Sequence, residues 1–162
     1  MSELNEVIKN VDFDDDASVQ EFFIIFNVSR FDHYLSSEEC DNEVVICYSD
    51  VKSDPLKMVY FNEINDKFIE MYNGLYNLSD GNVSILIDGV MQENVSSEAY
   101  SSAFSAAIKE NPLCGFLFSN LGLYVMAGYD LTHTFYILKN KIHLLDDINI
   151  LIKKSGLFIL DF

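Results

Sequence analysis

The sequence predicts an α+β fold, with a mainly antiparallel sheet and three to four helices packed on one side of it, in a single compact domain over residues 1–162. Two observations favour this class. Short runs of β-branched and alternating residues are joined by connections too short for parallel crossovers, and stretches with helical spacing of apolar residues lie between them. No repeat or Pro/Ser-rich linker divides the chain, and an apolar content of 49% is enough to fill a core.

The first third of the chain is expected to contain one helix and one hairpin. The segment Ser18-Val-Gln-Glu21 matches a capping box, and apolar residues follow at helical spacing as far as Arg30. The same run, FFIIFNV, is also compatible with a central strand. Residues 43–49 and 56–61 are short and rich in β-branched or aromatic residues, so we expect them to pair as a hairpin closed by residues 50–55.

The rest of the chain alternates between the two periodicities, with local signals at most boundaries. The first expected elements are a helix capped by Asn62, a strand at 83–90, and a helix capped by Ser96 or Ser97 and stopped at Pro112. Four strands should follow, at 113–118, 123–127, 134–138 and 142–145. The chain should then form a helix capped by Asp146 or Asp147, with Gly156 at its C′ position, and a last strand at 157–162.

The charge of the chain is strongly negative and unevenly placed. The net charge is −16, from 26 acidic and 10 basic residues, and residues 1–54 carry 14 of the acids but only 3 of the bases. Such a field repels nucleic acid phosphates and anionic lipid headgroups, so we expect no direct contact with nucleic acid or a membrane. The expected partner is a basic protein.

The carboxylates expected to bind that partner are concentrated in two segments of the first third. They are Asp12, Asp14, Asp15, Asp16, Glu38, Glu39, Asp41 and Glu43. The first four also suggest a cation loop, but the twelve-residue calcium pattern fails, because Ala17 replaces its glycine and Phe23 its final glutamate. We expect no metal and no cofactor.

No catalytic motif is recognisable in the sequence. There is no Gly-x-Ser-x-Gly elbow, no phosphate-binding glycine loop and no paired cysteine spacing. His133 lies in a strand-like segment, but the tripeptides of the two-histidine phosphoesterases are not formed there or at His143. We therefore expect a protein that is not an enzyme.

These observations favour a bacterial immunity or inhibitor protein that neutralises a basic toxin domain, typically a nuclease, through its acidic surface. Two alternatives remain open: a phage-type acidic mimic of DNA, and an enzyme with an unrecognised site in a pocket near His133 or His143. The first ten residues lack a basic region and an apolar core typical of a signal peptide, which predicts a cytoplasmic location. Residues 111–129 carry no charge, but their glycines and proline favour a buried hairpin over a membrane span.

Overall fold

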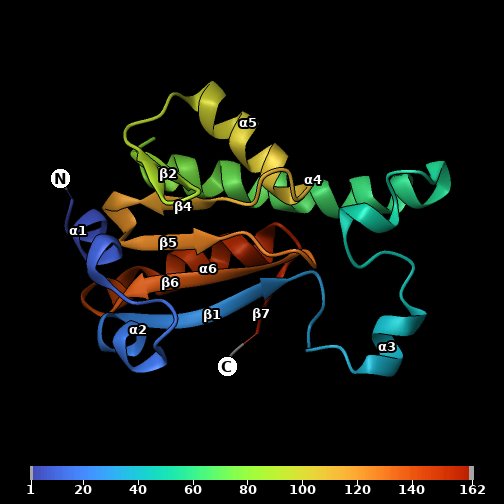
Figure 1. The fold of residues 1–162 in the computed structure, drawn as a ribbon, viewed down its shortest axis with the longest axis horizontal. Coiled ribbons are helices and arrows are strands. Elements are labelled where there is room, and N and C mark those ends of the chain that lie inside the picture. The colour runs from blue at the N-terminus through green and yellow to red at the C-terminus, as the bar shows by residue number, and fades with distance from the viewer. Residues whose placement is uncertain (1, 161–162) are drawn as a thin grey trace.

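The computed structural model describes residues 2–160 and contains a seven-stranded sheet in which every neighbouring pair of strands is antiparallel (Figure 1). The strand order across the sheet is β3-β2-β4-β5-β6-β1-β7. The strands are β1 (Phe23–Ser29), β2 (Val83–Ile87), β3 (Val90–Gln92), β4 (Gly115–Phe118), β5 (Leu123–Met126), β6 (Thr132–Leu138) and β7 (Phe158–Leu160). The expected α+β class and the antiparallel sheet are confirmed.

The described residues form six α-helices rather than three to four, and the helices cover both faces of the sheet rather than one. They are α1 (Glu3–Asn10), α2 (Asp16–Phe22), α3 (Ser37–Asn42), α4 (Pro55–Leu78), α5 (Ser97–Ile108) and α6 (Leu145–Lys154). Short 3₁₀ helices are present at Tyr48–Asp50, Ser119–Leu121 and Lys139–Leu144.

The main core lies between the sheet and the layer formed by α4, α5 and α6. Phe68 and Tyr72 of α4, together with Tyr100 and Phe104 of α5, pack against inward residues of the sheet such as Phe116. A smaller core lies on the opposite face, where α1 and α2 cover only part of the sheet. Its buried residues are Leu4, Ile8, Val19, Phe23, Leu117, Tyr124 and Leu138.

The helix predicted from Ser18 to Arg30 is wrong beyond Phe22, because the FFIIFNV run forms strand β1. The strand lies between β6 and β7, and Phe23, Phe26 and Val28 are buried. Residues buried on both faces of a sheet give a continuous apolar run, which also fits a buried helix. The predicted cap is wrong as well: Asp15 caps α2, and the Ser18 hydroxyl accepts a hydrogen bond from the Asp12 amide.

The hairpin predicted from residues 43–49 and 56–61 is also wrong, and the helix expected to be capped by Asn62 is capped by Asp54, eight residues earlier. Helix α4 starts at Pro55, and the carboxylate of Asp54 accepts hydrogen bonds from the amides of Leu56 and Lys57. A capping Asp followed by Pro is a strong start signal for a helix. The first turns of α4 therefore project beyond the sheet, and residues 30–54 form a lobe beneath them (Figure 1).

The second half of the chain follows the prediction closely. Ser96 caps α5 through the Ala99 amide, three successive strands follow as β4, β5 and β6, and Gly156 adopts a positive φ of 74° just after α6. Three predictions are wrong: residues 142–145 belong to a 3₁₀ helix and the start of α6, neither Asp146 nor Asp147 caps α6, which begins at Leu145, and the strand expected at 83–90 is divided into the paired strands β2 and β3. The last predicted strand is β7, and residues 161 and 162 lie outside the described residues. Within residues 2–160 no helix combines the length and apolar character needed to cross a membrane.

Candidate partner-binding surface

The sheet face that carries α1 and α2 is left partly open along β1 and β6. Side chains that point to this face alternate along both strands, and their register pairs Ile25 with Tyr136, Asn27 with Thr134 and Ser29 with Thr132. We call this row the β1–β6 strip. It consists of Phe23, Ile25, Asn27, Ser29, Thr132, Thr134 and Tyr136.

The strip changes from apolar to polar along its length. At the α2 end, the ring of Phe13 packs edge-on against Tyr136 with centroids 5.4 Å apart. At the other end, Thr134 Oγ1 donates to Asn27 Oδ1 at 2.9 Å, and Asn27 Nδ2 donates to the Tyr34 hydroxyl at 3.1 Å. Asn27 and Ser29 are buried at this end, so a ligand of the strip would meet the aromatic and aliphatic surface near α2 and the half-buried Thr132 and Thr134 at the other end.

Two hollows lie along the strip, one at each end. The larger has a volume of about 780 Å³ and lies between α2 and the strands, and we call it the α2 groove. Its lining residues are Phe13, Asp16, Val19, Gln20, Phe23, Ile24, Ile25, Thr134, Tyr136 and Lys139. The smaller, of about 230 Å³, lies between the strip and the lobe, and its lining includes Asn27 and Thr132 of the strip and His33 and Tyr34 of the lobe.

The first acidic segment, the α2-end cluster of Asp12, Asp14, Asp15 and Asp16, forms the loop before α2 and its first turn. Asp15 accepts a hydrogen bond from the Ala17 amide as the cap of α2, and Asp12 accepts one from the Asp14 amide. The carboxylates of Asp14 and Asp16 are exposed and have no hydrogen-bond or ion-pair partner within residues 2–160. These two are therefore available to an external cation.

The second acidic segment, the α3-end cluster of Glu38, Glu39, Asp41 and Glu43, lies in the lobe on and after α3. Glu43 turns inward, where its carboxylate pairs with Arg30 Nη2 at 3.2 Å. Glu39 accepts hydrogen bonds from the Ser36 amide at 2.8 Å and from His33 Nε2 at 2.9 Å. These hydrogen bonds lower the pKa of Glu39 to about 2, and the one from the Ser36 amide contributes more than the one from His33.

Glu38 and Asp41 of the same cluster are exposed, and their carboxylates have no partner in the part of the chain that the structure describes. Of the eight carboxylates selected from the sequence, four are thus engaged in local structure and four remain available. The available ones are Asp14, Asp16, Glu38 and Asp41.

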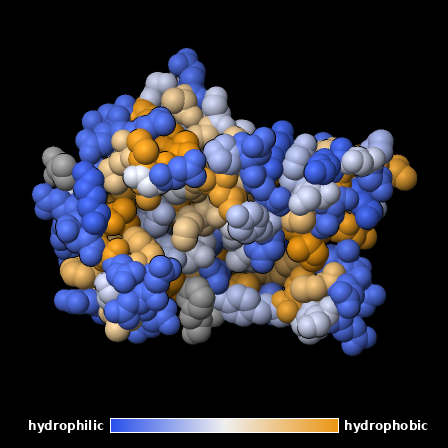
Figure 2. Space-filling model, in the orientation of Figure 1, coloured by the Kyte–Doolittle hydropathy of each residue, from blue (hydrophilic) through white to orange (hydrophobic). Residues whose placement is uncertain are grey.

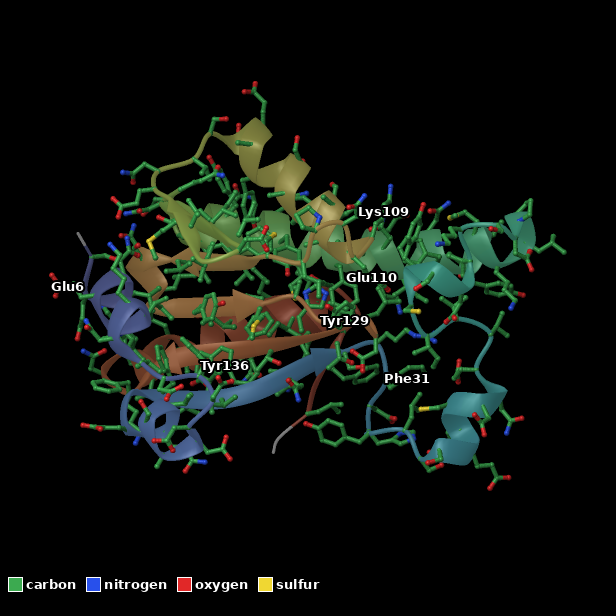
Figure 3. The ribbon with its side chains drawn as sticks, in the orientation of Figure 1. Glu6, Phe31, Lys109, Glu110, Tyr129 and Tyr136 are labelled. Carbon is green, nitrogen blue, oxygen red and sulfur yellow. The ribbon has the colours of Figure 1, made fainter. Side chains whose placement is uncertain are left out.

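The two clusters lie at opposite ends of the molecule rather than in one patch. Strand β1 runs from α2 towards the lobe that carries α3, and a seven-residue strand spans about 20 Å. Figure 3 labels Tyr136 near the α2 end of the strip and Phe31 beyond the far end of β1. In Figure 2, the surface over α2 and the surface over α3 are both mainly hydrophilic, and hydrophobic surface is visible elsewhere on the same face.

The histidine that suggested an enzymatic alternative lies in the main core. His133 is fully buried, its Nδ1 lies 2.6 Å from the Tyr72 hydroxyl, and Phe68 stacks on its ring. Burial lowers the pKa of His133 to about 3, so the ring stays neutral. His133 lines none of the three described pockets, and His143 is exposed on a 3₁₀ helix.

Sequence reasoning missed the residues that form the α2 groove, because Phe13, Ile25 and Tyr136 meet only through tertiary structure. Polar and apolar residues alternate in THTFYIL. Together with the strand interpretation of FFIIFNV, this alternation would have indicated a sheet face that is partly open to solvent. Among residues 2–160, no three His, Cys, Asp or Glu side chains are grouped as metal ligands.

Comparisons with protein-family models, with curated proteins and with solved structures find no match to this chain.

Proposed function

We propose that this protein is a non-catalytic inhibitor that binds a basic protein, a toxin nuclease domain of a bacterial competition system, in the cytoplasm. The observation that carries the proposal is the placement of four available carboxylates, Asp14 and Asp16 at one end of the β1–β6 strip and Glu38 and Asp41 at the other. A nuclease surface shaped to bind phosphates presents Lys and Arg, and carboxylates are their natural partners in a protein interface.

The span of the surface supports a protein partner. A typical stable interface buries about 800 Å² on each partner, so it extends well beyond one cluster of side chains. Two acidic ends separated by about 20 Å of strand match that scale. Charge at both ends also orients an approaching basic protein before contact, which raises the rate of productive encounter.

The separation of the acids favours an inhibitor over a mimic of DNA. Phosphates of a duplex follow each other every few ångströms along the backbone, and a mimic must reproduce that continuous row. Here the polar half of the strip carries Asn27, Ser29, Thr132 and Thr134, which are uncharged. The strip between the two acidic clusters thus resembles an ordinary protein interface, with its charges at the rim.

The test begins with recovery of the partner from the native host on the tagged protein. The partner should be basic, and its nuclease activity and toxicity should fall when this protein is added in equal amount. Replacing all four available carboxylates (Asp14→Asn, Asp16→Asn, Glu38→Gln, Asp41→Asn) should slow association about tenfold at low salt, and the difference should shrink at high salt.

A matched variant removes the same charge from α4 and α5, which cover the other face of the sheet: Glu63→Gln, Asp66→Asn, Glu70→Gln and Glu98→Gln. It should associate at close to the wild-type rate, because its changes leave both clusters intact. Equal slowing by the two variants would show that only bulk charge matters. A partner that is acidic, or one whose activity is unaffected, would rule out inhibition of a basic toxin.

A further inference from the structure

The α2 groove combines an apolar floor with an acidic wall. Phe23, Ile25 and Tyr136 of the β1–β6 strip form the floor, and Val19 of α2 closes one side. Phe13 anchors the acidic loop over this floor, since its ring contacts Tyr124 and Tyr136 at centroid distances of 5.6 and 5.4 Å. The loop is thereby held in place beside the groove.

The charge around the groove is one-sided. Residues 12–22, the loop and helix that supply Phe13, Asp16, Val19 and Gln20 to the groove lining, carry five carboxylates in all and neither Lys nor Arg. Asp16 is the one carboxylate of this segment that lines the groove, and Asp14, next in sequence to the lining residue Phe13, is exposed in the loop before the cap of α2. The opposite rim carries Lys139. A ligand that places its cations next to α2, and no cation next to Lys139 after β6, matches this arrangement.

The half-buried residues of the groove gain from being covered. Ile25 and Tyr136 are partly exposed, and both line the groove. Covering apolar surface of this kind is favourable in proportion to the area removed from water, and a buried aromatic anchor is the usual centre of a protein interface. The groove volume of about 780 Å³ is ample for one aromatic side chain and its neighbouring backbone.

We propose that the α2 groove receives an aromatic or aliphatic side chain from a segment of the basic partner, flanked by Lys or Arg residues that contact Asp14 and Asp16. This inference rests on the proposed function and names the part of the partner that is recognised. A second copy of this chain is a poor occupant, because its own net charge is −16.

The direct test uses peptides and chemical-shift mapping on the isotopically labelled protein. The probe is a ten-residue peptide with one central Phe flanked by Lys and Arg. One comparison peptide has Ala in place of the Phe, and another has Gln in place of each Lys and Arg. The basic Phe peptide should shift amides of α2, β1 and β6 around the groove, and should bind about tenfold more tightly than either comparison peptide.

The blocking variant is Gln20→Trp, which places a large ring on the exposed side of α2 at the groove rim, where it fills the space without altering the floor. The matched control is Ser102→Trp on the exposed face of α5. Gln20→Trp should abolish the specific binding of the Phe peptide, and Ser102→Trp should leave it unchanged. A circular dichroism spectrum and melting curve for each variant establish that it is folded.

Three results would overturn the inference: equal binding of the Phe and Ala peptides, equal binding of the charged and Gln peptides, or shifts that lie outside the groove. Equal binding of the charged and Gln peptides would show instead that the groove is an apolar pocket without preference for a basic ligand. Once the natural partner has been recovered, its dissociation rate from the Gln20→Trp variant is compared with that from the wild type. An unchanged rate would refute docking in the groove but not the proposed function. Failure of the proposed function is a separate outcome, because it is shown by a recovered partner that is acidic or whose activity is unaffected by this protein.

Discussion

The Tyr72 hydroxyl lies 2.6 Å from Nδ1 of His133, joining helix α4 to strand β6 in the middle of the main core. Both side chains are completely buried, and Nε2 of His133 has no hydrogen-bond partner among residues 2–160. The Tyr100 hydroxyl extends the network by donating to the Tyr72 carbonyl at 2.7 Å. A polar network inside an aromatic core makes the stability of the protein sensitive to pH and to single hydroxyl groups.

Stability should fall as the pH drops from about 6.5 towards 3, in part because of His133. Its folded pKa is lowered to about 3, so below pH 6.5 the unfolded chain binds a proton that the folded chain excludes. The free energy of unfolding should lose up to about 1.4 kcal/mol per pH unit from this residue. Urea unfolding of the wild type and His133→Phe at pH 4 to 7 measures the difference in slope. Parallel pH profiles would contradict it.

Removing the partner of His133 should destabilise the fold. Tyr72→Phe leaves Nδ1 of a buried imidazole without its hydrogen bond, which costs about 1–3 kcal/mol. Tyr76→Phe is the matched change one turn later on α4, where the hydroxyl has no hydrogen-bond partner in the described part of the chain. Urea unfolding at pH 7 should separate the two variants. Equal stability would mean that the Tyr72 hydroxyl contributes nothing.

The start of α4 should depend on Asp54. Its carboxylate accepts hydrogen bonds from the amides of Leu56 and Lys57, so Asp54→Ala should cost about 1 kcal/mol and loosen the projecting turns of α4. Asp66→Ala, at an exposed position inside the helix, should be nearly neutral. Amide hydrogen exchange along residues 56–62 is the sensitive measurement, and unchanged protection there would rule out the cap.

The α3 lobe should be most stable in mildly acidic solution. His33 Nδ1 lies 2.7 Å from Asp32 and Nε2 lies 2.9 Å from Glu39; these bonds, led by Asp32, raise the pKa of His33 above its usual value. A raised pKa stabilises the lobe below about pH 6.5, and this contribution is lost as the pH rises through the folded value.

The Glu39 carboxylate acts in the opposite direction. Its pKa is about 2, so its contribution is present above its ordinary pKa of about 4.5 and is lost as the pH falls towards 2. Protection of the α3 amides from exchange should therefore be higher at pH 5.5 than at pH 8. His33→Gln should remove that difference. Protection that rises with pH in the wild type would refute the arrangement.

Local signals predicted most elements of the C-terminal half of the fold, although not the strand expected at 142–145 or the expected cap of α6. Ser96 caps α5, Gly156 takes the positive φ that follows α6, and the strands between them show the expected alternation. In each of these elements the residues that set the boundary lie next to it in sequence. Prediction succeeded there because the deciding interaction is local.

The same signals failed where tertiary contacts decide. The run FFIIFNV fits a buried helix and a buried strand equally, and only pairing with β6 and β7 makes it strand β1. The segment LKMVYF looks like a strand by composition, but it continues a helix that buries Phe61, Ile64 and Phe68 on one face. For α4 a local signal existed at Asp54 and Pro55, and it outweighs the β-propensity of the residues that follow.

The sequence alone determined the acidity of this protein, its concentration in residues 1–54 and the α+β class, because composition and periodicity are properties of the chain itself. Tertiary structure decided what the acids can do. It turned Glu43 towards Arg30 and Glu39 towards His33, left Asp14, Asp16, Glu38 and Asp41 available, and set the two clusters at either end of β1. The apolar α2 groove also depends on it, since Phe13 and Tyr136 meet only when the chain has folded.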